Sequence, residues 1–105
     1  MARKVLRRPR AKQDLLEQAF FIANDNLDAA ERFLDAAEAA FARLLEMPEI
    51  GGARAYRNER LAGLRLWPIP GFERHLIFYL PIESGIEVVR VLDAARDVVA
   101  TLERE

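Results

Sequence analysis

The residues best suited to chemistry are one histidine and a set of arginines in the second half of the sequence. His75 opens the apolar run His75–Tyr79 and is the single histidine of the chain. It is a candidate general base, although a lone histidine in a strand is more often a structural residue. Guanidinium groups could stabilise the phosphate charge that develops when RNA is cleaved. The arginines considered for that role are Arg65, Arg74, Arg90 and Arg96.

Signatures of other enzyme classes are absent from the sequence. It has no hydrolase nucleophile motif, no phosphate-binding loop, no dinucleotide-binding glycine pattern and no HExxH pair. With no cysteine and one histidine, a disulfide framework, an iron–sulfur cluster and the common zinc sites are excluded. We therefore expect no cofactor and no metal, and ordinary small-molecule catalysis is not favoured.

Charge is segregated along the chain, although the net charge is only −1. Residues 1–12 carry six cations and no acid, whereas residues 13–50 carry nine acids and two arginines. Residues 51–80 have a net charge of +3 and residues 81–105 a net charge of −3. One interpretation is solvated faces with ion pairs inside the molecule. The other is an arginine-rich surface that binds an acidic partner or phosphates.

Length and composition indicate one small folded domain. The chain has 105 residues, of which 51% are hydrophobic and 31% charged, and we expect residues 1–105 to form a single domain. No run approaches the roughly 18 apolar residues of a membrane span, and no signal-peptide region follows the basic N-terminus. We therefore expect a cytoplasmic protein with no membrane partner.

The N-terminal half predicts a strand followed by a helical hairpin. Lys4–Arg7 is a short apolar stretch bounded by cations, which indicates a brief strand. Apolar residues at helical spacing follow over residues 10–23, and again from Asn26 or Asp28 to Met47. The turn-forming residues Asn24–Asn26 separate these stretches, so the two helices should be antiparallel neighbours.

The C-terminal half predicts three antiparallel strands and a short helix. The strands are expected in the apolar runs Leu64–Ile69, Leu76–Leu80 and Ile86–Leu92, which turn residues separate. Residues 94–104 should form a helix with Asp93 as its N-cap. The predicted fold is therefore α+β: an N-terminal strand, an antiparallel helical hairpin packed on an antiparallel sheet in the order β-α-α-β-β-β, and a short C-terminal helix.

Alternation along the strands divides the sheet into an apolar face and a mixed face. The apolar face is expected to pack on the helical hairpin and holds Leu64, Leu66, Leu76, Phe78 and Leu80. The mixed face carries aromatic and cationic side chains and needs a cover, which is either the C-terminal helix or a protein partner. Since Trp, Tyr and Arg are common at binding hot spots, we predict a partner there. The predicted anchors are Arg65, Trp67, Tyr79 and Arg90.

The sequence also carries a known pattern in five segments, which are residues 8–17, Leu44–Gly51, Gly63–Ile69, His75–Tyr79 and Gly85–Asp97. These segments resemble the RelE/ParE superfamily of bacterial toxins, and the last two are the most specific. The resemblance covers nearly the whole chain. It implies a toxin of a type II toxin–antitoxin module, neutralised by a co-encoded antitoxin, and a fold similar to the predicted order of elements.

That superfamily divides into ribosome-dependent mRNA endoribonucleases, similar to RelE, and gyrase poisons, similar to ParE. Arg96 matches an arginine that the nucleases use. The chain has no lysine after Lys12, however, and it has Val98, Val99 and Leu102 where the nucleases place an aromatic or basic residue. The resemblance is therefore closer to the ParE branch, which implies growth inhibition by action on DNA gyrase.

Two alternatives stay open at this point. One is a RelE-like endoribonuclease that uses Arg65, Arg74, His75 and Arg96, and the other is a non-toxic interaction module derived from a toxin. The partners that the resemblance implies are a cognate antitoxin and DNA gyrase, with a toxin–antitoxin heterotetramer as one form of the complex. The chain has no DNA-binding motif of its own, so we expect no sequence-specific DNA binding.

Overall fold

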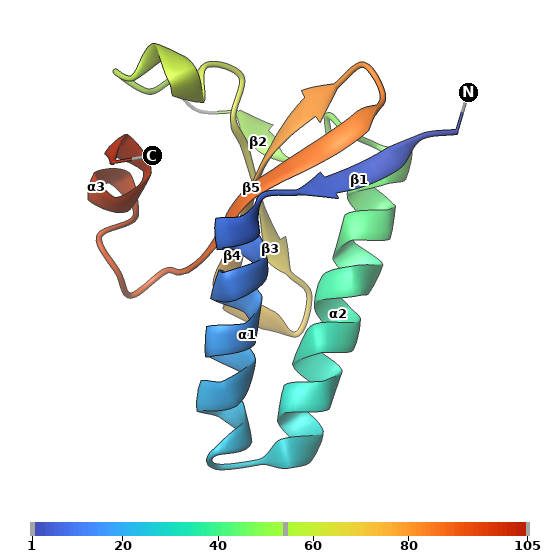
Figure 1. Cartoon of the computed structure of the whole chain (residues 1–105), viewed down its shortest axis with the longest axis vertical. Helices are drawn as coiled ribbons and strands as arrows, with labels where there is room; N and C mark the ends of the chain where they lie inside the picture. The colour runs from blue at the N-terminus through green and yellow to red at the C-terminus, as the bar shows by residue number, and fades with distance from the viewer. Residues whose placement is uncertain (1, 54, 105) are drawn as a thin grey trace.

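The protein is one β-sheet with a long helical hairpin on one face and a short helix on the other (Figure 1). The computed structural model describes residues 2–53 and 55–104. The elements in chain order are β1 (Lys4–Arg7), α1 (Pro9–Ala23), α2 (Leu27–Glu46), β2 (Gly52–Ala53), the 3-10 helix η1 (Glu59–Leu61), β3 (Arg65–Ile69), β4 (Phe72–Ile82), β5 (Gly85–Asp93) and α3 (Val98–Glu103). This confirms the predicted α+β class and order, with the two-residue strand β2 added. Across the described part of the chain, every helix is too short or too polar to cross a membrane.

The sheet has five strands in the order β1-β5-β4-β3-β2. β1 pairs with β5 in parallel, whereas the other pairs are antiparallel, so the sheet is mixed rather than antiparallel throughout. A parallel pair needs a long connection, and the hairpin and the three following strands supply it. The close approach of β1 requires Gly85, because a Cβ there would lie 2.0 Å from the carbonyl oxygen of Lys4.

The two long helices begin where local signals place them. Pro9 occupies the first turn of α1, where its missing N–H costs nothing. Asn26 caps α2 by accepting a hydrogen bond from the N–H of Ala29 at 3.0 Å, as one of the two predicted starts requires.

The predicted start of the last helix is wrong. β5 runs to Asp93, and the N–H of Ala94 still donates to the carbonyl of Arg74 at 2.7 Å, so Asp93 belongs to the sheet and does not cap a helix. The N-cap of α3 is Asp97, which accepts from the N–H of Ala100 at 3.1 Å.

The expectation about which face meets the hairpin is also wrong, because the two faces are exchanged. The mixed face packs on α1 and α2, and its buried residues include Ile69, Ile77, Tyr79, Ile86 and Val88. The purely apolar face instead packs on α3 and the η1 segment, with Leu64, Phe78, Val89, Leu92 and Leu102 in one cluster. The hairpin accepts a mixed face because the polar groups of Tyr79 and Arg90 find hydrogen-bond partners inside the fold, as described below.

Candidate functional site

Side chains of α1 complete the edge of β5 beyond the end of β1. β1 pairs with β5 only as far as Val88, while β5 continues to Asp93. The N–H of Val91 donates to Oδ2 of Asp14 at 3.0 Å, and the carbonyl of Val91 accepts from Nε2 of Gln18 at 2.8 Å. Asp14 and Gln18 are one helical turn apart and lie on the same side of α1. Together they satisfy main-chain groups that a neighbouring strand would otherwise bind.

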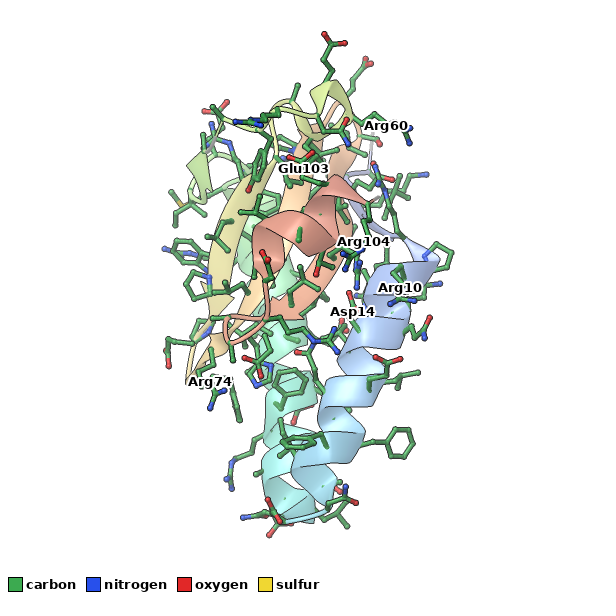
Figure 2. The ribbon with its side chains drawn as sticks, turned by 90° about the vertical axis from the view of Figure 1, so that its left-hand side faces the viewer. Arg10, Asp14, Arg60, Arg74, Glu103 and Arg104 are labelled. Carbon is green, nitrogen blue, oxygen red and sulfur yellow. The ribbon has the colours of Figure 1, made fainter. Side chains whose placement is uncertain are left out.

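Asp14 also forms a buried ion pair with Arg90. Nε and Nη2 of Arg90 donate to the two carboxylate oxygens at 2.7 and 2.9 Å, a bidentate geometry. Asp14 is 2% and Arg90 3% exposed. In Figure 2, Asp14 lies on the side of α1 that is next to the sheet. A charge buried this deeply must be paired, so the contact fixes the position of α1 against β5.

His75 extends this polar group to the next strand. Its Nδ1 lies 2.6 Å from Oε1 of Gln18. Since the amide nitrogen of Gln18 donates to Val91, its oxygen accepts, and Nδ1 of His75 therefore carries the proton. Burial is the main cause that lowers the pKa of His75 below its ordinary value of 6.5. The negative charge of Asp93 opposes this shift, and the positive charge of Arg74 adds to it. In the neutral ring with the proton on Nδ1, the lone pair is on Nε2.

A cavity of about 240 Å³ lies beside this group. It is lined by Asp14, Glu17, Gln18, Phe21, His75, Asp93 and Arg96. Its lining includes three carboxylates, one guanidinium and one imidazole, and neither a serine nor a threonine nucleophile.

The four residues proposed for an endoribonuclease are only partly brought together. His75 and Arg96 line the same cavity, and Arg74 pairs with Asp93 at its rim, with Nη2 to Oδ1 at 3.5 Å. Figure 2 shows Arg74 near the end of the strands. Arg65 is paired with Tyr79, four residues farther along β4 than His75, a separation of about 13 Å. Arg65 therefore lies apart from the other three residues.

Arg65 and Tyr79 instead hold the segment that follows α2. The hydroxyl of Tyr79 donates to the carbonyl of Pro48 at 2.8 Å and accepts from the N–H of Gly51 at 2.9 Å. Nη1 of Arg65 donates to the carbonyls of Glu49 and Gly51 at 3.0 and 2.6 Å. Burial is the main cause of the raised pKa of Tyr79. These contacts fasten the connection between α2 and β2 to the sheet.

Of the predicted partner-binding residues Arg65, Trp67, Tyr79 and Arg90, the last two are buried within the fold and the first two are half-buried. Tyr79 is fully buried, Trp67 packs on the hairpin core, and Arg90 is paired with Asp14. The cover is the hairpin, not a partner and not α3. Arg65 keeps partial exposure, and a role for it in binding stays a prediction.

The described residues do contain an exposed apolar groove, which lies between the two long helices. Leu16 is 55%, Phe20 72% and Leu27 64% exposed, although all are large and apolar. The groove has a volume of about 190 Å³. Its lining is Leu16, Ala19, Phe20, Ala23, Leu27, Ala30, Glu31 and Leu34, which we call the hairpin groove. A contiguous exposed apolar surface of this kind is typical of a protein-binding site.

Sequence reasoning missed both this groove and the role of Asp14 and Gln18, although each had a signal. Apolar residues occupy more of the circumference of α1 than one buried face needs, and the adjacent Phe20 and Phe21 cannot point the same way. Asp14 interrupts the buried stripe between Ala11 and Leu15, which marks a polar contact inside the fold.

Comparison with known protein families gives one match. Residues 5–98 match the family model described as the ParE toxin of the type II toxin-antitoxin system, parDE. No match was found among the curated proteins compared with the chain. The matched range includes β1 from its second residue, both long helices, all the following strands and the first residue of α3.

Proposed function

The chain belongs to the ParE toxin family of type II toxin–antitoxin systems, and on that premise we propose that it arrests growth by binding DNA gyrase and is neutralised by a cognate antitoxin. The observation that carries this proposal is the family match over residues 5–98. The action proposed is contact with another protein, without chemistry by this chain. Its place of action is the cytoplasm, where gyrase works on DNA.

The geometry of the former nuclease candidates supports a non-enzymatic action. Arg65 is engaged with main-chain carbonyls of the segment that follows α2, so its guanidinium is not available to a phosphate bound beside His75. His75, Arg74 and Arg96 lie around one cavity without Arg65, and the cleavage test below decides whether they act on RNA.

The hairpin groove supports an antitoxin as the second partner. Its apolar side chains would be covered by the apolar stripe of an amphipathic helix. Residues 13–50, which include almost all of both helices, carry nine acids against two arginines, and Glu31 lines the groove itself. Lysines or arginines beside that apolar stripe would complement this charge. We therefore propose that an amphipathic, basic helix of the antitoxin occupies the groove.

The gyrase proposal is tested with the purified chain, DNA gyrase and plasmid DNA. We expect inhibition of supercoiling and trapped DNA cleavage complexes, both relieved when the product of the neighbouring gene is added. Unchanged supercoiling with no trapped complexes would contradict the proposal. In parallel, mRNA in a translating extract should stay intact. Cuts placed by codon that disappear in Arg96→Ala would favour the endoribonuclease instead.

The antitoxin proposal is tested with two neighbouring phenylalanines of similar exposure. Phe20, which is 72% exposed, lines the hairpin groove, whereas Phe21, which is 75% exposed, points to the cavity beside His75. Phe20→Glu should weaken the complex with the neighbouring gene's product at least tenfold, and growth arrest should return on co-expression. Phe21→Glu is the matched control and should keep neutralisation. Equal effects of the two substitutions would show that the groove is not the binding site.

A further inference from the structure

β1 is an edge strand with main-chain groups directed away from the sheet. It is the first strand in the order β1-β5-β4-β3-β2, and in Figure 1 no other element passes in front of it. The N–H of Lys4 donates to the carbonyl of Ser84 at 2.8 Å and the N–H of Arg8 to that of Val88 at 3.1 Å. Because these directions alternate along a strand, the main-chain groups of Val5 and Arg7 point outward. They form a short template for one more strand.

The side chains around this edge are strongly basic. Residues 1–12 carry six cations and no acid. Arg7 pairs with Glu38 and Arg8 with Glu87, so both are used within the fold. The side chains of Arg3 and Lys4 are exposed, and neither forms an ion pair with any other residue in the ranges 2–53 and 55–104. The first half of the edge therefore has positive charge available to an incoming chain.

The exposed face of β1 also offers a small apolar contact. Leu6 is 40% exposed and is paired with Glu87 on β5. A strand laid beside β1 would place alternate side chains next to Leu6 and toward α2. An apolar residue beside Leu6, with acids close to Arg3 and Lys4, fits this surface.

A second copy of this chain is a poor occupant of the edge. Pairing β1 with β1 of another copy would bring the same cations together from both sides, and lysine or arginine on an edge strand is a common device against such self-association. The same charges attract a strand of opposite sign. The occupant that fits this edge best is therefore an acidic segment in extended conformation.

We propose that β1 accepts an additional strand from an acidic, extended segment of the antitoxin, with main-chain hydrogen bonds to Val5 and Arg7. The inference rests on the proposed function, because it assigns the segment to the antitoxin. It adds a second contact, separate from the hairpin groove, whose affinity comes from the backbone and from charge. Arg3 and Lys4 then serve to select this segment and to exclude a second toxin molecule.

The experiment uses the complex of this chain with the product of the neighbouring gene and measures residue-level amide hydrogen exchange by NMR. In the toxin alone, the amides of Val5 and Arg7 should exchange rapidly, whereas those of Lys4 and Arg8 are protected by β5. In the complex, the exchange of Val5 and Arg7 should slow at least tenfold. The amides of Lys4 and Arg8 are the internal control, because their exchange should not depend on the added strand.

Two charge-reversal variants, one on β1 and one control, complete the test. Lys4→Glu should weaken the complex five- to tenfold at low salt, with the difference decreasing at high salt. Arg57→Glu, an equally large charge change at an exposed position between β2 and η1, should leave the dissociation constant within twofold, because β2 is at the opposite edge of the sheet from β1. A stable complex in which Val5 and Arg7 still exchange rapidly would overturn the added strand while leaving the proposed function intact. A neighbouring gene product that neither binds nor neutralises the toxin would overturn both.

Discussion

Helix α1 presents two contrasting regions on opposite sides. Toward β5, Asp14 and Gln18 satisfy main-chain groups of Val91, the guanidinium of Arg90 and the ring of His75. Away from the sheet, Leu16 and Phe20 lie exposed in the hairpin groove. Polar groups are buried and paired on one side, whereas apolar groups are exposed on the other. The first region maintains the fold, and the second is available to a partner.

The contrast teaches that polarity does not by itself identify the functional side of this helix. A buried polar cluster with a histidine and arginines resembles an active site in composition, yet its hydrogen bonds are used for packing. The exposed apolar side makes fewer contacts and is therefore the side on which substitutions should change binding more than stability. The following substitutions test that distinction.

The largest effect is expected at Asp14. Asp14→Ala leaves the guanidinium of Arg90 buried and removes the acceptor of the Val91 N–H, so the free energy of unfolding should fall by about 3–5 kcal/mol in urea denaturation. Glu38→Ala removes a partially exposed partner of Arg7 and should cost less than about 1 kcal/mol. The double variant Asp14→Leu/Arg90→Met should recover part of the loss. Equal costs at Asp14 and Glu38 would show that the buried pair has no special role.

Gln18 should show an intermediate effect. Gln18→Ala removes partners from the carbonyl of Val91 and from His75, and we expect a loss of about 1–2 kcal/mol by the same measurement. Gln13→Ala, in the same helix, removes only a bond to Glu17 at the surface and should change stability by less than about 0.5 kcal/mol. If both substitutions lowered the free energy of unfolding by less than about 0.5 kcal/mol, the hydrogen bonds of Gln18 would not be stabilising the edge of β5.

Phe20 should show almost no effect on stability despite its size. Because the side chain is 72% exposed, Phe20→Ser should change the free energy of unfolding by less than about 0.5 kcal/mol. The variant should also bind less of a hydrophobic dye and self-associate less, since it removes exposed apolar surface. A loss above about 2 kcal/mol would show that Phe20 belongs to the core and not to the binding region.

The smallest effect concerns the protonation of His75. Its pKa is lowered by burial, so the unfolded chain takes up a proton near pH 6.5 whereas the folded chain does so only at lower pH. The free energy of unfolding should therefore decrease as the pH falls from about 7.5 to 5.5, and the decrease should be small because His75 is only part buried. In His75→Gln this part of the pH dependence should be absent. An identical pH dependence in both proteins would contradict the assignment.

The positions of the elements were largely predictable, but the site was not. Local patterns were enough for both long helices and for the Asn26 cap, because hydrophobic periodicity and capping act within a few residues. The start of α3 was misplaced because Asp93 is held in the sheet by the contact of Ala94 with Arg74, 20 residues away. The burial of the predicted anchors Tyr79 and Arg90 was missed for a related reason, since exposure depends on which layer covers a strand.

The sequence by itself determined the α+β class, the order of the elements, the two faces of β3 and β4 and the uneven charge of the N-terminal segments. In β5 a bulge interrupts the alternation, so that Val88 and Val91 face the hairpin whereas Val89 and Leu92 face α3. Only the tertiary structure decided which face meets the hairpin, that Arg90 pairs with Asp14 across 76 residues of sequence, and that the exposed apolar surface lies on α1 and α2. The alternation of side chains along a strand is a local property with a period of two residues. Whether the hairpin or α3 covers a given face of the sheet depends instead on the shape and polar contacts of segments far apart in the chain.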